Sequence, residues 1–140
     1  MLSLKRKDPG FTLIELLIVV VVISILAGIG LTALGRAQRS ARDNDRRSDI
    51  ETIRGALEEF YADNNSYPST GIAAMTLDLE GGGHIGDVPD DPDPSLNYDY
   101  EQLASGQGYC IAAGLEDPRP EDPSGTCNGT SYDYVKDQID

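Results

Sequence analysis

The apolar residues of the chain are concentrated in one long run near its N-terminus. Between Phe11 and Leu34 there are 24 residues, and only four of them carry polar side chains: Thr12, Glu15, Ser24 and Thr32. In an α-helix, at about 1.5 Å per residue, this run is about 36 Å long, and the hydrocarbon core of a bilayer is about 30 Å thick. The pattern therefore predicts a membrane-spanning helix over residues 11–35.

A second pattern follows the apolar run. Ile50, Ile53, Leu57 and Phe60 recur at intervals of three and four residues, which places them on one face of a helix. We expect the same helix to continue over residues 36–62 with this face buried. It should end in the segment ADNNSYPS, because Asn tolerates left-handed backbone conformations and Pro prevents easy continuation.

Strand patterns appear only in the C-terminal half. The alternation over residues 96–100 and the apolar run over 108–113 predict two strands, with a turn between them at 105–108. Residues 132–135 predict a third strand. The fold class is therefore α+β: a long N-terminal helix, apolar in its first half and amphipathic in its second, packs on a small antiparallel β-sheet with loops.

Other parts of the head, residues 63–140, are less regular. Residues 71–80 are expected to form a short helix or an irregular connection. Gly81, Gly82 and Gly83 have neither a preceding strand nor the following Lys-Ser/Thr of a phosphate-binding loop. We therefore expect a flexible loop at the glycines and an exposed His84.

Charge separates the basic stem from the acidic head. Residues 1–54 hold 9 Lys or Arg and 6 Asp or Glu, whereas residues 55–140 hold 2 and 18. An acidic head repels phosphate, so no general nucleic-acid binding is expected of it. The 140 residues include one His, two Cys and no Trp, which excludes a Cys/His metal cage and leaves little for acid–base catalysis. We therefore do not expect an enzyme.

Several arginines follow the apolar run directly. They are interspersed with Asp43, Asp45, Asp49 and Glu51. One interpretation is contact with nucleic acid or lipid headgroups, and the other is a salt-bridged helix surface within a filament. The mixed signs favour the second interpretation. The arginines concerned are Arg36, Arg39, Arg42, Arg46 and Arg47.

Glu15 is unusual because it lies inside the apolar run. A carboxylate in a membrane helix costs about 2.5–3.5 kcal/mol near the bilayer centre, and less near an end. If the chain is cut between Gly10 and Phe11, the new ammonium group of Phe11 lies one helical turn from Glu15, and the Glu15 of one chain can neutralise the ammonium of a neighbour. The alternative is a plain signal anchor in which Glu15 is tolerated near a helix end.

The string GFTLIELLIVVVVISILAG at residues 10–28 resembles the class III signal sequence of type IV pilins and type II secretion pseudopilins. This resemblance implies that residues 1–10 are a leader that prepilin peptidase removes after Gly10. It further implies that Phe11 is N-methylated and that Glu15 guides docking into a filament. Tyr61, Asn64, Tyr67 and Pro68 also resemble the segment that follows the long helix in major pseudopilins.

The resemblance implies a structural subunit that polymerises through its N-terminal helices into an extracellular pilus-like filament. The alternative is a pseudopilin of a type II secretion system, and a competence pilin for DNA uptake ranks third. The implied partners are further copies of the chain, prepilin peptidase, an inner-membrane assembly platform with its ATPase, and minor pilins. Before assembly the chain is expected to cross the membrane once with its head outside the cytoplasm. Afterwards it belongs to an extracellular filament or a periplasmic pseudopilus.

For a head outside the cytoplasm, a disulfide between Cys110 and Cys127 is the default, with free thiols as the alternative. No cofactor is expected, although clustered carboxylates make calcium a candidate. Major pseudopilins bind calcium in a C-terminal Asp/Gly-rich loop, to which this chain has no residue-by-residue match. The candidate ligands here are instead Asp87, Asp90, Asp91 and Asp93.

Overall fold

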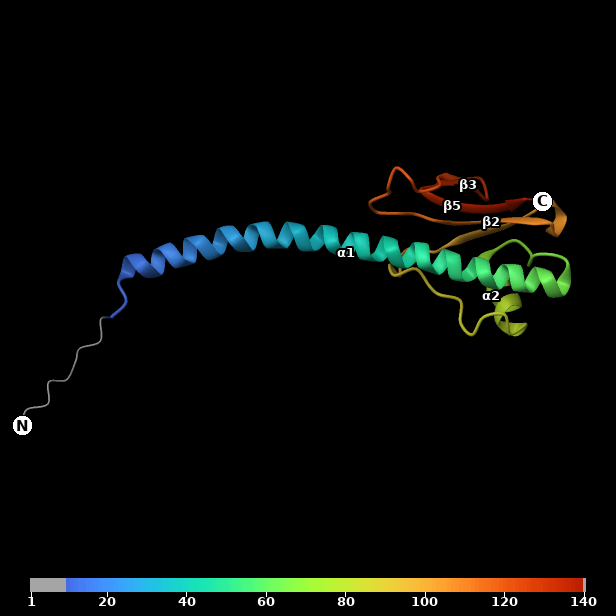
Figure 1. Cartoon of the computed structure of the whole chain (residues 1–140), viewed down its shortest axis with the longest axis horizontal. Coiled ribbons are helices and arrows are strands. Elements are labelled where there is room, and N and C mark those ends of the chain that lie inside the picture. The colour runs from blue at the N-terminus through green and yellow to red at the C-terminus, as the bar shows by residue number, and fades with distance from the viewer. Residues whose placement is uncertain (1–9, 140) are drawn as a thin grey trace, which may run out of the picture. The chain divides into compact units, whose positions relative to one another are not determined.

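A computed structural model of the chain describes residues 10–139 (Figure 1). The predicted leader therefore lies outside the described residues, except for Gly10. The chain contains two α-helices, a short 3₁₀ helix and five strands. In chain order these elements are α1 (Leu13–Asn64), α2 (Ile72–Gly81), β1 (Asp99–Leu103), η1 (Ala104–Gly106), β2 (Gly108–Ala113), β3 (Gly125–Cys127), β4 (Thr130–Tyr132) and β5 (Tyr134–Ile139).

The strands form two small antiparallel sheets. The first has the order β1-β2-β5, with Tyr100 opposite Ile111 and Ile111 opposite Lys136. The second is the hairpin of β3 and β4. Its two-residue turn is Asn128-Gly129, with φ of 51° and 75°, a pair of positive values that suits a tight hairpin. The predicted α+β class, a long helix on a small antiparallel sheet, is confirmed.

Two of the predicted strands differ in their bounds. The first begins only at Asp99, because the preceding chain turns at Asp93, whose carbonyl accepts a hydrogen bond from the Leu96 amide at 2.9 Å. The third is divided at Asp133, so that Tyr132 ends β4 and Tyr134 begins β5. Each side of the division pairs with a different strand, which a period-two pattern in the sequence does not reveal.

The chain divides into two compact units, residues 1–37 and 38–140, and α1 runs through the boundary. The core of the second unit forms around the predicted apolar face of α1, where Ile50, Ile53 and Leu57 have no exposed surface. In Figure 1 this part of α1 lies between the three-stranded sheet and α2. The residues that pack against it include Met75 and Leu79 of α2 and Tyr100, Tyr109 and Ile111 of the sheet.

The end of α1 lies within the predicted segment. Asn64 is the last helical residue, and its side-chain amide donates to the Phe60 carbonyl at 2.9 Å. Asn65 has a φ of 53° and donates its amide to Tyr61 at 2.8 Å. A left-handed Asn after the helix is the termination that the sequence predicts.

The prediction for the glycine run and His84 is wrong. Gly81 belongs to α2, and the Gly83 and His84 amides donate to the carbonyls of Glu80 and Leu79 at 3.1 and 2.9 Å. This paired arrangement caps the C-terminus of a helix and places Gly83 at a φ of 76°. The His84 side chain is only 7% exposed, because its ring packs edge-on against Phe60 with centroids 5.3 Å apart.

Candidate functional site

The predicted cleavage position lies just before α1. Gly10, Phe11 and Thr12 precede the first helical residue, Leu13, and have no regular secondary structure. The Phe11 side chain is 86% exposed. The bond between Gly10 and Phe11 is therefore presented outside the helix.

Thr12 and Glu15 fix the point at which the helix begins. The amide and the hydroxyl of Thr12 both donate to Oε2 of Glu15, at 2.9 and 2.8 Å, and the Glu15 amide approaches the Thr12 hydroxyl oxygen at 3.3 Å. This reciprocal pairing of Thr with a Glu three residues later is a capping box, which satisfies amides that have no partner inside the helix. Glu15 therefore has a local structural role that we did not predict, although the Thr-x-x-Glu spacing is visible in the sequence.

The apolar half of α1 exposes its side chains in the first unit. Every large apolar residue from Leu13 to Leu34 is exposed, and even Val22 retains 48% of its surface. By length and composition the helix is able to cross a membrane. A surface of this extent needs lipid or protein to cover it.

In the head, one stretch of α1 carries three arginines that reach distant loops. Arg46 has no exposed surface, and it binds Asp91 with two nitrogens at 2.9 Å each and Asp43 at 2.8 Å. Arg42 holds both carboxylate oxygens of Glu116 at 2.6 Å. Arg47 holds both oxygens of Asp122, at 2.8 and 2.5 Å. We call Arg42, Arg46 and Arg47 the arginine cluster.

The arginine cluster perturbs the ionisation of its partners. The pKa of Glu116 is lowered to about 2, because Arg42 donates two hydrogen bonds to it and Arg46 a third. The pKa of Asp122 is also lowered, chiefly by its hydrogen bonds with Arg47. The pKa of Arg46 is raised, mainly by its hydrogen bonds to Asp91. All these groups are charged at neutral pH.

These contacts only partly match the expected salt-bridged helix surface. Arg46–Asp43 and Arg54–Glu51 are pairs along the helix. Asp91, Glu116 and Asp122, however, come from loops 45 to 75 residues away, so the arginines attach loops to the helix. Within residues 10–139, Arg36 and Arg39 form no ion pair at all.

The four candidate calcium ligands are not equivalent. Asp91 uses both oxygens on Arg46, and one of them also accepts the Asp93 amide at 2.8 Å. One oxygen of Asp93 accepts the amide and the hydroxyl of Ser95, at 3.0 and 2.7 Å. Asp87 and Asp90 are exposed. Calcium prefers six to eight oxygen ligands around one point, and this loop does not offer such a set.

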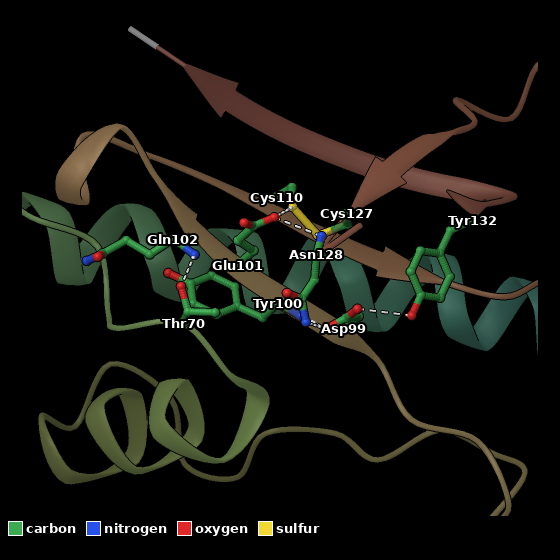
Figure 2. Close-up of a disulfide and its surroundings, with 9 residues drawn as sticks. All are labelled: Thr70, Asp99, Tyr100, Glu101, Gln102, Cys110, Cys127, Asn128 and Tyr132. Carbon is green, nitrogen blue, oxygen red and sulfur yellow. Dashed lines mark hydrogen bonds between the residues drawn. A yellow bond between two sulfur atoms is a disulfide. The ribbon is translucent and has the colours of Figure 1, made fainter. Parts of the chain in front are cut away.

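The predicted disulfide is present in the structure. Cys110 of β2 is joined to Cys127 at the end of β3, and both residues are almost fully buried. The bond attaches the β3–β4 hairpin to the three-stranded sheet (Figure 2). Around it, Glu101 accepts the Asn128 amide at 2.8 Å, and Asp99 accepts the Tyr132 hydroxyl at 3.0 Å.

Among the described residues, one group of three Cys, His or acidic side chains is close enough together to hold a metal ion: Glu101, Cys110 and Cys127. Its two sulfur atoms are already used in the disulfide. The head therefore offers structural links between its elements rather than a catalytic constellation.

A long N-terminal helix with an exposed apolar half and an amphipathic half packed on a small antiparallel sheet is the pilin-like architecture. The family model described as the prokaryotic N-terminal methylation motif matches residues 5–31. The predicted class III signal sequence is thereby confirmed.

Curated relatives extend this similarity over most of the chain. The type II secretion system core protein G of Aeromonas hydrophila is 32% identical over 114 residues, which cover 74% of this chain and 78% of the relative. The corresponding protein of Pseudomonas aeruginosa is 32% identical over 113 residues, covering 73% and 78%. The major component of the type IV wide pilus of Thermus thermophilus is 34% identical over 110 residues, covering 78% and 75%. No solved structure shows significant similarity.

The chain therefore belongs to the family of type IV pilins and type II secretion pseudopilins. The relatives named above are components of a secretion system or a pilus, and none of the three is named as an enzyme.

Proposed function

We propose that this chain is the structural subunit of an extracellular type IV pilus-like filament. Prepilin peptidase would cut between Gly10 and Phe11 and methylate the new N-terminus. The observation that carries the proposal is the exposed apolar half of α1 beside a complete, separately packed head. Lipid covers this surface in the single-pass membrane form, with the head outside the cytoplasm, and neighbouring stems cover it in the filament.

Moving a stem from lipid into a bundle of stems gains little from the hydrophobic effect, since both surroundings are apolar. Packing and polar contacts must then favour assembly. Glu15 suits this role, because its Oε2 is bound to Thr12 and its second oxygen, Oε1, has no hydrogen bond within residues 10–139. That oxygen can accept the Phe11 ammonium of a neighbouring copy.

The proposed partners follow from this cycle. They are further copies of the chain, prepilin peptidase, an inner-membrane assembly platform with its ATPase, and minor pilins. The head, with 2 basic and 18 acidic residues after residue 54, is not proposed to bind nucleic acid generally. A competence pilin for DNA uptake is accordingly the weakest of the filament functions.

A pseudopilin of a type II secretion system is the second candidate. Relatives named as core protein G support it as strongly as the pilus component supports the first, at 32% and 34% identity. In this function the filament would be a periplasmic pseudopilus.

One experiment separates the two candidates. A strain lacking this chain is compared with the complemented strain by electron microscopy of the cell surface and by mass spectrometry of the culture medium. A pilin predicts loss of surface filaments with unchanged secreted proteins. A pseudopilin predicts accumulation of hydrolases in the periplasm and no change in surface filaments. A deletion that changes neither surface filaments nor secretion would refute both.

A further inference from the structure

Two acidic loops of the head converge on the same stretch of α1. The first, residues 88–97, contributes Asp91, and the second, residues 114–124, contributes Glu116 and Asp122. The second loop also donates the amides of Glu116 and Asp117 to the Asp43 carboxylate, at 2.9 and 2.8 Å. Carboxylates gathered in this way repel one another unless a positive charge lies among them.

Arg46 supplies the central positive charge. Its guanidinium lies within 3.2 Å of oxygens from three carboxylates, those of Asp43, Asp91 and Glu116. It has no exposed surface, and the Asp91 side chain is only 2% exposed. A planar guanidinium matches the two oxygens of Asp91 side by side, which fixes the loop in orientation as well as in distance.

Arg42 and Arg47 extend the same arrangement. Each holds one loop carboxylate by both oxygens, Glu116 and Asp122 respectively. Arg119 adds a contact from the loop back to the helix, donating to the Asn44 side chain at 2.6 Å. The carboxylates that order these loops thus have their oxygens directed at guanidinium and amide groups.

A divalent cation would have to compete with these groups. Calcium needs six to eight oxygens directed at one point, and the Arg46 guanidinium occupies the point on which three of the carboxylates converge. The residues of these loops therefore do not fit the calcium that the resemblance to major pseudopilins implies.

We propose that the arginine cluster takes the place of a divalent cation in this head, so that its acidic loops are ordered without calcium. This inference goes beyond the proposed function, because a subunit of either filament could depend on a cation or dispense with it. It assigns to three arginines of one helix the ordering of loops 88–97 and 114–124.

The test uses the mature full-length chain in detergent micelles. Hydrogen exchange followed by mass spectrometry reports on the two loops, and near-ultraviolet circular dichroism of the buried tyrosines reports thermal unfolding. Each measurement is made in EDTA and in calcium chloride at about 10 mM, above the dissociation constants of about 10⁻⁴ to 10⁻³ M found in extracellular modules. The wild-type chain should give the same exchange rates and the same midpoint in both.

Three variants connect this result to the arginines. Arg46→Gln should lower the midpoint by more than about 10 °C, since it leaves buried carboxylates without a counter-charge. Arg47→Gln should speed exchange in residues 114–124 at least about tenfold, because a charge-assisted contact of that loop is lost. Arg39→Gln is the matched control: it makes the same change on the same helix at an exposed residue with no ion pair in the described part of the chain. It should leave both measurements unchanged.

The outcomes are decisive in either direction. Slower exchange of either loop in calcium, or a wild-type midpoint that falls by more than about 5 °C in EDTA, would overturn the proposal. Unchanged exchange in Arg47→Gln would overturn it as well. If Arg46→Gln does not fold, Arg47→Gln still carries the test, because Arg47 and Asp122 lie nearer the surface of the head. No step measures assembly, so failure here is distinct from failure of the filament function.

Discussion

Glu15 has two separable roles, a helix cap and a charge, and substitutions can remove one or both. Glu15→Gln keeps an acceptor that can cap the helix with Thr12, but it removes the negative charge. Glu15→Leu removes both. Ser24→Ala is the matched control, because it deletes a polar group of the same apolar stretch whose hydroxyl donates only to the Val20 carbonyl at 2.7 Å.

The two roles differ in size. Losing a helix cap costs about 0.5–2 kcal/mol. Leaving the Phe11 ammonium buried and unpaired among apolar stems costs about 3–5 kcal/mol, by analogy with broken buried ion pairs. In the isolated membrane form the sign is reversed, since removing a carboxylate from an apolar helix saves up to about 3 kcal/mol. Both variants should therefore insert at least as well as wild type and fail at assembly.

Electron microscopy of sheared filaments, beside a membrane-fraction blot of the same strain, measures both steps. We expect processed, membrane-bound subunits and few filaments from Glu15→Gln and from Glu15→Leu. Ser24→Ala should assemble normally. If the charge dominates, the two Glu15 variants fail to a similar degree.

The refuting result is equally definite. Abundant filaments of normal length from Glu15→Gln subunits alone would show that the carboxylate acts only as a cap. Abundant filaments from Glu15→Leu would show that it is merely tolerated near a helix end.

Three further predictions can be checked independently. Mass spectrometry of assembled material should find a chain that begins at N-methylated Phe11, and an intact leader would contradict the processing site. Replacing Cys110 and Cys127 together by Ala should lower the thermal midpoint by at least about 10 °C, since a loop of this size is worth about 3 kcal/mol, and an unchanged midpoint would make the bond dispensable. The pKa of Glu116 is lowered to about 2 in the folded chain, so its stabilising contribution is present above its unfolded value of about 4.3 and is lost as pH falls toward 2. Thermal unfolding from pH 6 to pH 2 should accordingly show a shallower acid loss for Glu116→Gln than for the exposed control Glu121→Gln, and equal slopes would contradict it.

Features that depend on neighbours along the chain were predictable. Ile50, Ile53 and Leu57 form the buried face of α1, and the helix ends at the Asn pair before Pro68. The strand over residues 108–113 has the predicted bounds. In each case the signal is the period of a helix or a strand, or the backbone preference of one residue, and both are local properties.

His84 and the arginines show where such reasoning ends. His84 is buried because α2 ends where its ring meets Phe60 of a different helix. Arg46 is buried because Asp91 and Glu116 come to it from 45 and 70 positions away. Spacing rules for side-chain pairs on a helix reach only three or four residues, so they predicted partners on α1 and missed those in the loops.

By itself the sequence determined that this chain has an apolar stem, a processing motif and an acidic head, because each of these is written in consecutive residues. It also pointed to the cysteine pair once the head was placed outside the cytoplasm. Only the tertiary structure decided which charges meet and which side chains are buried. The reason is that a buried ion pair depends on the sheet and loops bringing distant carboxylates to one helix, and no local pattern encodes that distance.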